Sequence, residues 1–149
     1  MITEFKEFDF DLKSLKDFHG HLGPYLVAGA RMGVIANEEL SKNKLEKYCI
    51  VRCDTTPMSC LIDGIQFVSG CTYGTRRIVA TSEGIPEAIF IHEEKEIRIK
   101  LKKPFQFKGE GLDELEDYVK EFMKSPIHDV FEIQSNFPLR KYYKKKLTE

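Results

Sequence analysis

Apolar side chains recur at every third or fourth position in several stretches of the chain, a spacing that predicts amphipathic helices. A short helix is expected at 12–17, and a longer, mostly apolar helix over 22–40. Apolar positions also continue over 58–69, where Gly70 supplies a helix stop. The 3–4–3 spacing of apolar residues over 112–122 predicts a further amphipathic helix.

Shorter apolar or alternating segments predict strands at Tyr48–Asp54 and Arg76–Thr81. We expect Glu87–His92 and Glu96–Leu101 to form a hairpin, because the second of these alternates apolar and charged side chains. A short helix at Ile127–Glu132 would follow the last amphipathic helix. The expected order is therefore α-β-α-β-β-β followed by C-terminal helices. This is an α+β architecture, with helices on one face of a partly antiparallel sheet.

Length and composition favour one soluble globular domain. The chain has 149 residues, of which 42% are hydrophobic and 32% charged, enough to form a core of its own. We expect a single domain over 1–138 and a basic tail over 139–149. A net charge of −1 argues against a nucleic-acid binder. The longest uncharged stretch has twelve residues, too few to span a membrane, and the acidic N-terminus lacks a signal pattern, so we expect a cytoplasmic protein.

Two histidines flank Gly20 just before the second predicted helix. Helical side chains two residues apart diverge by about 200°, so His19 and His21 would face the same way only on an extended backbone. Gly20 itself, and Gly23-Pro24 after the pair, argue against a helix here. The two residues are either candidate metal ligands or a pair of hydrogen-bonded structural histidines.

Cys60 is a candidate reactive residue at the start of a helix. If Thr56 caps that helix and Pro57 lies in its first turn, the positive helix end lowers the pKa of the Cys60 thiol. Thiolate is the form that a nucleophile or a metal ligand requires. Asp63 and Gln66 follow on the same helix face. Asp63 is a candidate ligand, general base or carboxylate that orients a histidine. The alternative is a polar helix face beside a core cysteine.

The next cysteine opens a loop with the sequence GCTYGTRR. Its Gly, Thr and Arg residues, including Thr72, predict either an ordinary turn or an anion-binding loop. A straight helix would separate Cys71 from Cys60 by about 16 Å. One metal ion would therefore meet both only after the helix unwinds or across an oligomer interface. Cys49 and Cys53 are expected in the core.

The apolar helix over 22–40 contains two kinds of exceptional residue. Arg31 is its only formal charge between Leu22 and Asn37, and a lone charge on a largely apolar helix needs a partner. Gly29 and Gly33 are one helical turn apart, so they share a face on which another backbone can approach closely.

The motifs FHGHLGPYLVAGARMG and CLIDGIQFVSGCTYGTRR resemble those of the FmdE family, named for a subunit of molybdenum or tungsten formylmethanofuran dehydrogenase. The resemblance implies an α-β-α-β-β-β unit with a mixed sheet, a homodimer and, in some members, a zinc or similar ion near these motifs. Many members have Cys where this chain has Gly23, and Ala where it has Gly64. The positions that match the family pattern are His19, His21, Arg31, Cys60, Asp63, Gln66, Cys71 and Thr72.

From the resemblance we expect a small metal-binding protein. The expected metal is zinc, and its expected ligands are His19, His21, Cys60 and the weaker candidate Cys71. Cys60, Asp63 and His21 are the residues expected to take part in any catalysis, with Asp63 orienting a histidine. The expected binding residues for a small anionic or pterin-like ligand are Arg31, Gln66 and Thr72.

The resemblance leaves three roles open. The protein is an accessory protein of formylmethanofuran metabolism or a metal-dependent enzyme, with an open coordination position for water or substrate. Alternatively, it is a metal-free enzyme in which Cys60 is the nucleophile, His21 its base and Arg31 the anion holder. The third role is a non-catalytic dimeric subunit that partners the formylmethanofuran dehydrogenase subunits.

Overall fold

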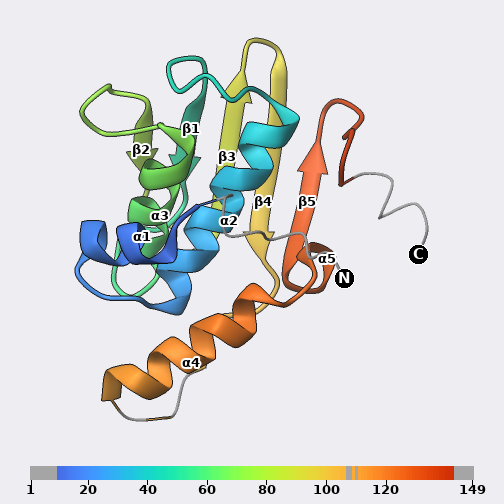
Figure 1. The fold of residues 1–149 in the computed structure, drawn as a ribbon. Coiled ribbons are helices and arrows are strands. Elements are labelled where there is room, and N and C mark those ends of the chain that lie inside the picture. Colours follow the sequence, from blue (N-terminus) through green and yellow to red (C-terminus); the bar gives the residue numbers. More distant parts are fainter. Residues whose placement is uncertain (1–9, 107–108, 110, 143–149) are drawn as a thin grey trace.

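The computed structural model describes residues 10–106, 109 and 111–142, which form a helical layer on one face of a five-stranded mixed sheet (Figure 1). The strand order is β2-β1-β3-β4-β5, in which β1 and β2 are parallel and the other pairs antiparallel. The elements in chain order are α1 (Leu12–His19), α2 (Pro24–Glu39), β1 (Tyr48–Val51), α3 (Cys60–Ser69), β2 (Ile78–Ala80), β3 (Glu87–His92), β4 (Lys95–Leu101), α4 (Gly111–Met123), α5 (Ile127–Val130) and β5 (Phe131–Ser135). The mixed α+β fold is as expected.

The core lies between the sheet and the helices α2 and α3. On β4, Ile97, Ile99 and Leu101 are buried and the residues between them are only partly covered, as the alternation predicted. Almost the whole of α2 is buried, which explains why its sequence is apolar on all sides. No helix among the described residues is long and apolar enough to cross a membrane.

Helices α2 and α3 touch through their backbones. A Cβ atom built at Gly29 would lie 2.2 Å from the carbonyl oxygen of Leu61, and one at Gly64 would lie 2.0 Å from the carbonyl oxygen of Leu26. A Cβ at Gly33 would lie 3.0 Å from Val68. The prediction that glycines of α2 admit another backbone is confirmed. Gly64, which in the sequence is only a small departure from the family pattern, is needed for the same contact.

Arg31 joins α2 to the end of α4. Its side chain is fully buried, and Nη1 donates to the carbonyl oxygen of Phe122 at 2.8 Å while Nη2 donates to that of Ser125 at 2.5 Å. The last carbonyls of a helix carry partial negative charge, so a buried cation is favourable there. The structure therefore engages this arginine in holding the end of α4 against α2.

Two local predictions are wrong. The segment expected to be helical over Ile127–Glu132 is helical only to Val130, after which β5 pairs with β4 and buries Phe131 and Ile133. Helix α3 begins at Cys60, without the expected Thr56 cap. The cause is a tight turn before the helix, in which the carbonyl of Pro57 accepts the N–H of Cys60.

The start of the expected basic tail is held against α2. Both oxygens of the buried Glu39 carboxylate accept backbone N–H groups, from Arg140 at 2.8 Å and from Lys141 at 2.7 Å. A buried carboxylate needs such donors because it has lost its water. The rest of the tail, 143–149, lies outside the described residues.

Candidate metal centre

The two histidines come together at the end of α1 rather than on an extended strand. His19 is the last residue of α1, and Gly20 then turns the chain with φ 112°, a left-handed conformation that favours glycine. His21 follows in the short connection to α2. The ring centroids of His19 and His21 are 4.9 Å apart and tilted by 47°. The helix stop at Gly20 therefore replaces the extended backbone that the spacing suggested.

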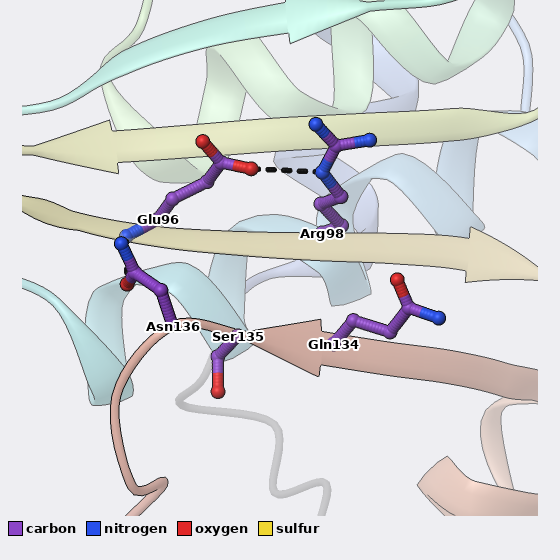
Figure 2. A pocket seen from close by; sticks show the side chains of 5 residues that line it. All are labelled: Glu96, Arg98, Gln134, Ser135 and Asn136. Carbon is purple, nitrogen blue, oxygen red and sulfur yellow. Dashed lines mark hydrogen bonds and ion pairs between the residues drawn. The ribbon is translucent and has the colours of Figure 1, made fainter.

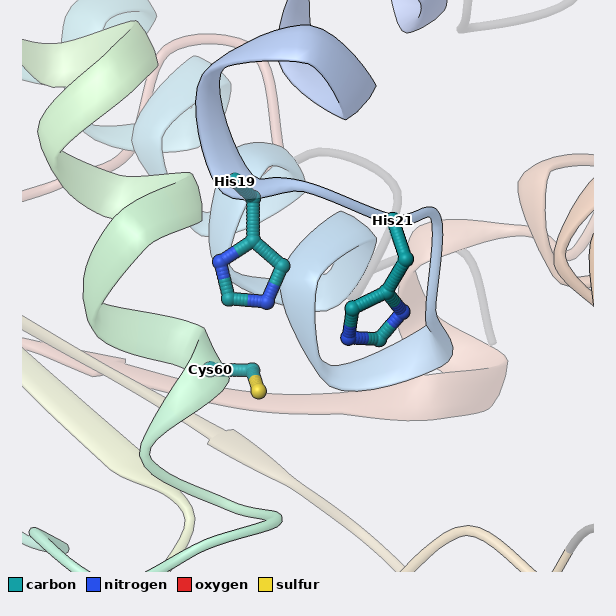
Figure 3. Close-up of side chains that lie close together, drawn as sticks. All are labelled: His19, His21 and Cys60. Carbon is teal, nitrogen blue, oxygen red and sulfur yellow. The ribbon is translucent and has the colours of Figure 1, made fainter.

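Cys60 is the third member of this group and comes from a distant part of the chain. It is the first residue of α3, and its side chain lies beside the two imidazoles (Figure 3). One ligand atom from each of His19, His21 and Cys60 lies within 4.8 Å of the others. Around a tetrahedral zinc ion, with zinc–sulfur bonds of about 2.3 Å and zinc–nitrogen bonds of about 2.1 Å, neighbouring ligand atoms lie about 3.3–3.6 Å apart. The ligand atoms of the group would therefore have to draw together by up to about 1.3 Å to hold one ion.

Asp63 orients His19. Its Oδ2 lies 2.7 Å from His19 Nδ1. An ionised carboxylate only accepts hydrogen bonds, so Nδ1 carries the proton and the lone pair of His19 belongs to Nε2. The same carboxylate–histidine pair is the usual support of a metal-binding histidine. Asp63 is one turn along α3 from Cys60, which explains how one helix supplies both groups.

The surroundings of Cys60 raise the pKa of its thiol. The cause is mainly burial, to which the nearby Asp63 carboxylate adds. The prediction that the helix start lowers this pKa is therefore wrong, because the cost of burying a thiolate outweighs the benefit of the helix end. A bound divalent cation would be the largest local charge and would favour the thiolate directly.

Gln66 lies about one turn after Asp63 on α3, and Thr72 lies in the turn that follows this helix. Gln66 Nε2 donates to Asp63 Oδ1 at 3.1 Å, and Gln66 Oε1 accepts the Tyr73 N–H at 2.8 Å. The hydroxyl of Thr72 lies 2.9 Å from that of Thr75 within the same turn. Thr72 thus stabilises a turn, whereas Gln66 contacts the carboxylate that supports the histidine. Nothing in the sequence marked the Tyr73 backbone as a part of this group.

Cys71 is not part of the histidine–cysteine group. It is fully buried at the other end of α3, where its thiol contacts the carbonyl oxygen of Lys47 at 3.4 Å. Cys49 and Cys53 are also buried. Among the described residues the structure thus brings His19, His21, Cys60, Asp63 and Gln66 together, and places Arg31, Cys71 and Thr72 elsewhere.

A separate shallow pocket of about 210 Å³ lies on β4 and β5 (Figure 2). Its polar groups are largely engaged with the protein. Arg98 Nε donates to Glu96 Oε2 at 2.8 Å, and the Asn136 amide binds the backbone of Glu94 and Glu96. Ser135 donates to the carbonyl oxygen of Phe137. Because these polar groups already bond within the protein, the pocket is a weaker candidate for ligand binding than the histidine–cysteine group.

Comparisons with known proteins agree with this fold. The crystal structure of an FmdE-like protein from Syntrophus aciditrophicus, named for its similarity to a tungsten formylmethanofuran dehydrogenase component, matches with a TM-score of 0.64 and 16% sequence identity. The match covers 97% of this chain and 82% of that protein. At this identity the likeness shows a shared fold.

A curated relative matches over a shorter region. It is a probable S-adenosyl-L-methionine-binding protein from Archaeoglobus fulgidus, 37% identical over 71 residues. The match includes 43% of this chain and 18% of the relative, so the chain spans about a fifth of the relative's length.

The model of one protein family covers most of the chain. It is the model described as FmdE, molybdenum formylmethanofuran dehydrogenase operon, and it matches residues 18–145. These residues include the histidine–cysteine group and all five strands. The chain belongs to the FmdE family.

Proposed function

We propose that this protein binds one divalent metal ion, zinc, through His19, His21 and Cys60. The observation that supports this proposal is the convergence of two imidazoles and a thiol, with ligand atoms within 4.8 Å of one another. Imidazole and thiolate suit zinc, whereas magnesium and calcium prefer oxygen ligands. The carboxylate of Asp63 on His19 Nδ1 adds the support that such a ligand usually has.

Three protein ligands favour a working site over a purely structural one. Structural zinc sites have four protein ligands, whereas catalytic sites have three and keep one position for water or substrate. Zinc held in this way supplies a Lewis acid that polarises the group bound to it. The exposed side chain of His21 leaves the site reachable from solvent.

The biological role that we propose rests on the family. We place the protein in formylmethanofuran-related C1 metabolism, as a metal-dependent enzyme or as an accessory protein of the dehydrogenase subunits. A small anionic or pterin-like molecule is the proposed occupant of the open position. We also propose that the protein is a homodimer in the cytoplasm.

The proposal is tested by elemental analysis of the untagged protein. Inductively coupled plasma mass spectrometry is applied to the wild type and to His21→Ala and Cys60→Ser, each before and after reconstitution with zinc. A Gln134→Met variant, altered at an exposed position of β5, is the control. We expect close to one ion per chain in the wild type and in the control, and a loss in both site variants.

The result that contradicts the proposal is a wild type without metal after reconstitution. Rapid and selective alkylation of Cys60 in that protein would then favour the enzyme in which this cysteine is the nucleophile.

A further inference from the structure

A line of hydrogen bonds joins the turn after α3 to a candidate metal ligand. The Tyr73 N–H donates to Gln66 Oε1 at 2.8 Å, and Gln66 Nε2 donates to Asp63 Oδ1 at 3.1 Å. Asp63 Oδ2 in turn lies 2.7 Å from His19 Nδ1. The line therefore runs from the backbone of one loop to a side chain on α1, through two residues of α3.

The direction of each hydrogen bond in this line follows from which atoms can donate. A backbone N–H is only a donor, so it must face the oxygen of the Gln66 amide. The nitrogen of the same amide then faces Asp63, whose carboxylate is only an acceptor. Both contacts of the Gln66 amide are satisfied in this orientation, and flipping the amide would break both.

Asp63 needs this second donor to stay in place. Its side chain is 36% exposed, compared with 13% for His19, so surrounding atoms do not by themselves hold the carboxylate. With Gln66 bound to Oδ1, the other oxygen is aimed at His19 Nδ1. The orientation of Asp63 then decides which nitrogen of His19 carries the proton.

We propose that Gln66 is a positioning residue for the metal site. Its amide, anchored on the Tyr73 backbone, holds Asp63 in the orientation that keeps the proton of His19 on Nδ1 and leaves Nε2 as the ligand atom. The part of this inference that concerns metal affinity rests on the proposed function. The part that concerns the tautomer of His19 does not.

Among the described residues, the Gln66 side chain has hydrogen bonds to Asp63 and to the Tyr73 backbone and to no other group. The stop of α3 uses its main-chain carbonyl, which accepts the Gly70 N–H at 3.3 Å and is kept in any substitution. Gln66→Met keeps a similar length without hydrogen bonds. Gln66→Glu keeps the shape and the acceptor for Tyr73, but places a second carboxylate against Asp63.

The test measures the tautomer of His19 by long-range ¹H–¹⁵N correlation NMR, on protein stripped of metal with a chelator. At about pH 8 we expect the Nδ1–H form to dominate over the Nε2–H form in the wild type. In both Gln66 variants the Nε2–H form should gain. Gln134→Met, the same substitution at an exposed position of β5, is the matched control and should retain the wild-type ratio.

The second arm measures the dissociation constant for Co²⁺ by the absorption of its thiolate complex. We expect Gln66→Met to weaken binding by about tenfold, the lower end of the loss seen when partners of metal ligands are removed. An unchanged His19 tautomer in both Gln66 variants would overturn the proposal, as would an equal change in Gln134→Met. A wild type that shows the tautomer effect but takes up no Co²⁺ would contradict the proposed function and leave the positioning role of Gln66 supported.

Discussion

Replacing Gly64 with alanine tests how the contact between α2 and α3 holds the site together. An alanine Cβ would lie 2.0 Å from the carbonyl oxygen of Leu26 and 2.5 Å from the backbone nitrogen of Ala30. Close carbon–oxygen contacts are about 3.3 Å, so the helices would have to separate by about 1.3 Å. Both obstructing atoms belong to the backbone, so no side-chain rotation relieves the overlap.

The cost of the substitution follows from two opposing effects. Over-packing of a core contact costs about 1–3 kcal/mol, and the upper end applies because two rigid helices must move. Alanine regains about 1 kcal/mol over glycine through its helix propensity. We therefore expect the free energy of unfolding to fall by about 2 kcal/mol. For a chain of this size, that lowers the melting temperature by about 4–8 °C.

Urea and thermal unfolding followed by circular dichroism measure this change. Gly74→Ala is the matched control, because a Cβ there meets nothing within 4 Å. The dissociation constant for Co²⁺ should also rise in Gly64→Ala, since α3 carries Cys60 and α2 follows His21. A Gly64→Ala protein as stable as the wild type would refute the argument that the two backbones touch.

Two further predictions concern the site and the pH dependence of stability. A Cβ at position 23 would lie 3.2 Å from His21 Cε1, so Gly23→Cys should add a thiolate ligand and strengthen Co²⁺ binding at least about tenfold. Gly23→Ala, which adds no sulfur, should leave the affinity for Co²⁺ unchanged. Equal affinities in the two variants would contradict this prediction. Arg52 and Thr81 lower the pKa of Glu83 to about 2. This carboxylate therefore contributes stability above its unfolded pKa of about 4.5, and that contribution is lost as the pH falls toward 2. Urea unfolding over this range should show a smaller loss in Glu83→Gln than in the wild type, and parallel curves would contradict it.

Local pattern was sufficient for most of the secondary structure, and its failures have identifiable causes. Apolar spacing predicted α2, α4 and the β3–β4 hairpin close to their observed bounds. It missed β5, because this strand directly follows the helical turn of α5 and its apolar alternation consists of just two residues, Phe131 and Ile133. Only the free edge of β4 makes this short segment a strand, since its hydrogen bonds come from a distant partner.

For the site, the sequence by itself determined the chemistry of the members and their local spacing. It placed two histidines around Gly20, a cysteine at a helix start and an acid one turn later, because these relations depend only on neighbouring residues. The family resemblance then suggested that His19 and Cys60 meet.

Only the tertiary structure decided how the distant members meet. Cys60 reaches the histidines because glycines let α2 and α3 pack backbone to backbone. The same packing directs Arg31 to the end of α4 and leaves Cys71 buried at the far end of α3. Residue spacing along a chain constrains contacts within a turn or a strand pair, whereas contacts between elements depend on how closely their surfaces fit. That fit is a property of the folded molecule.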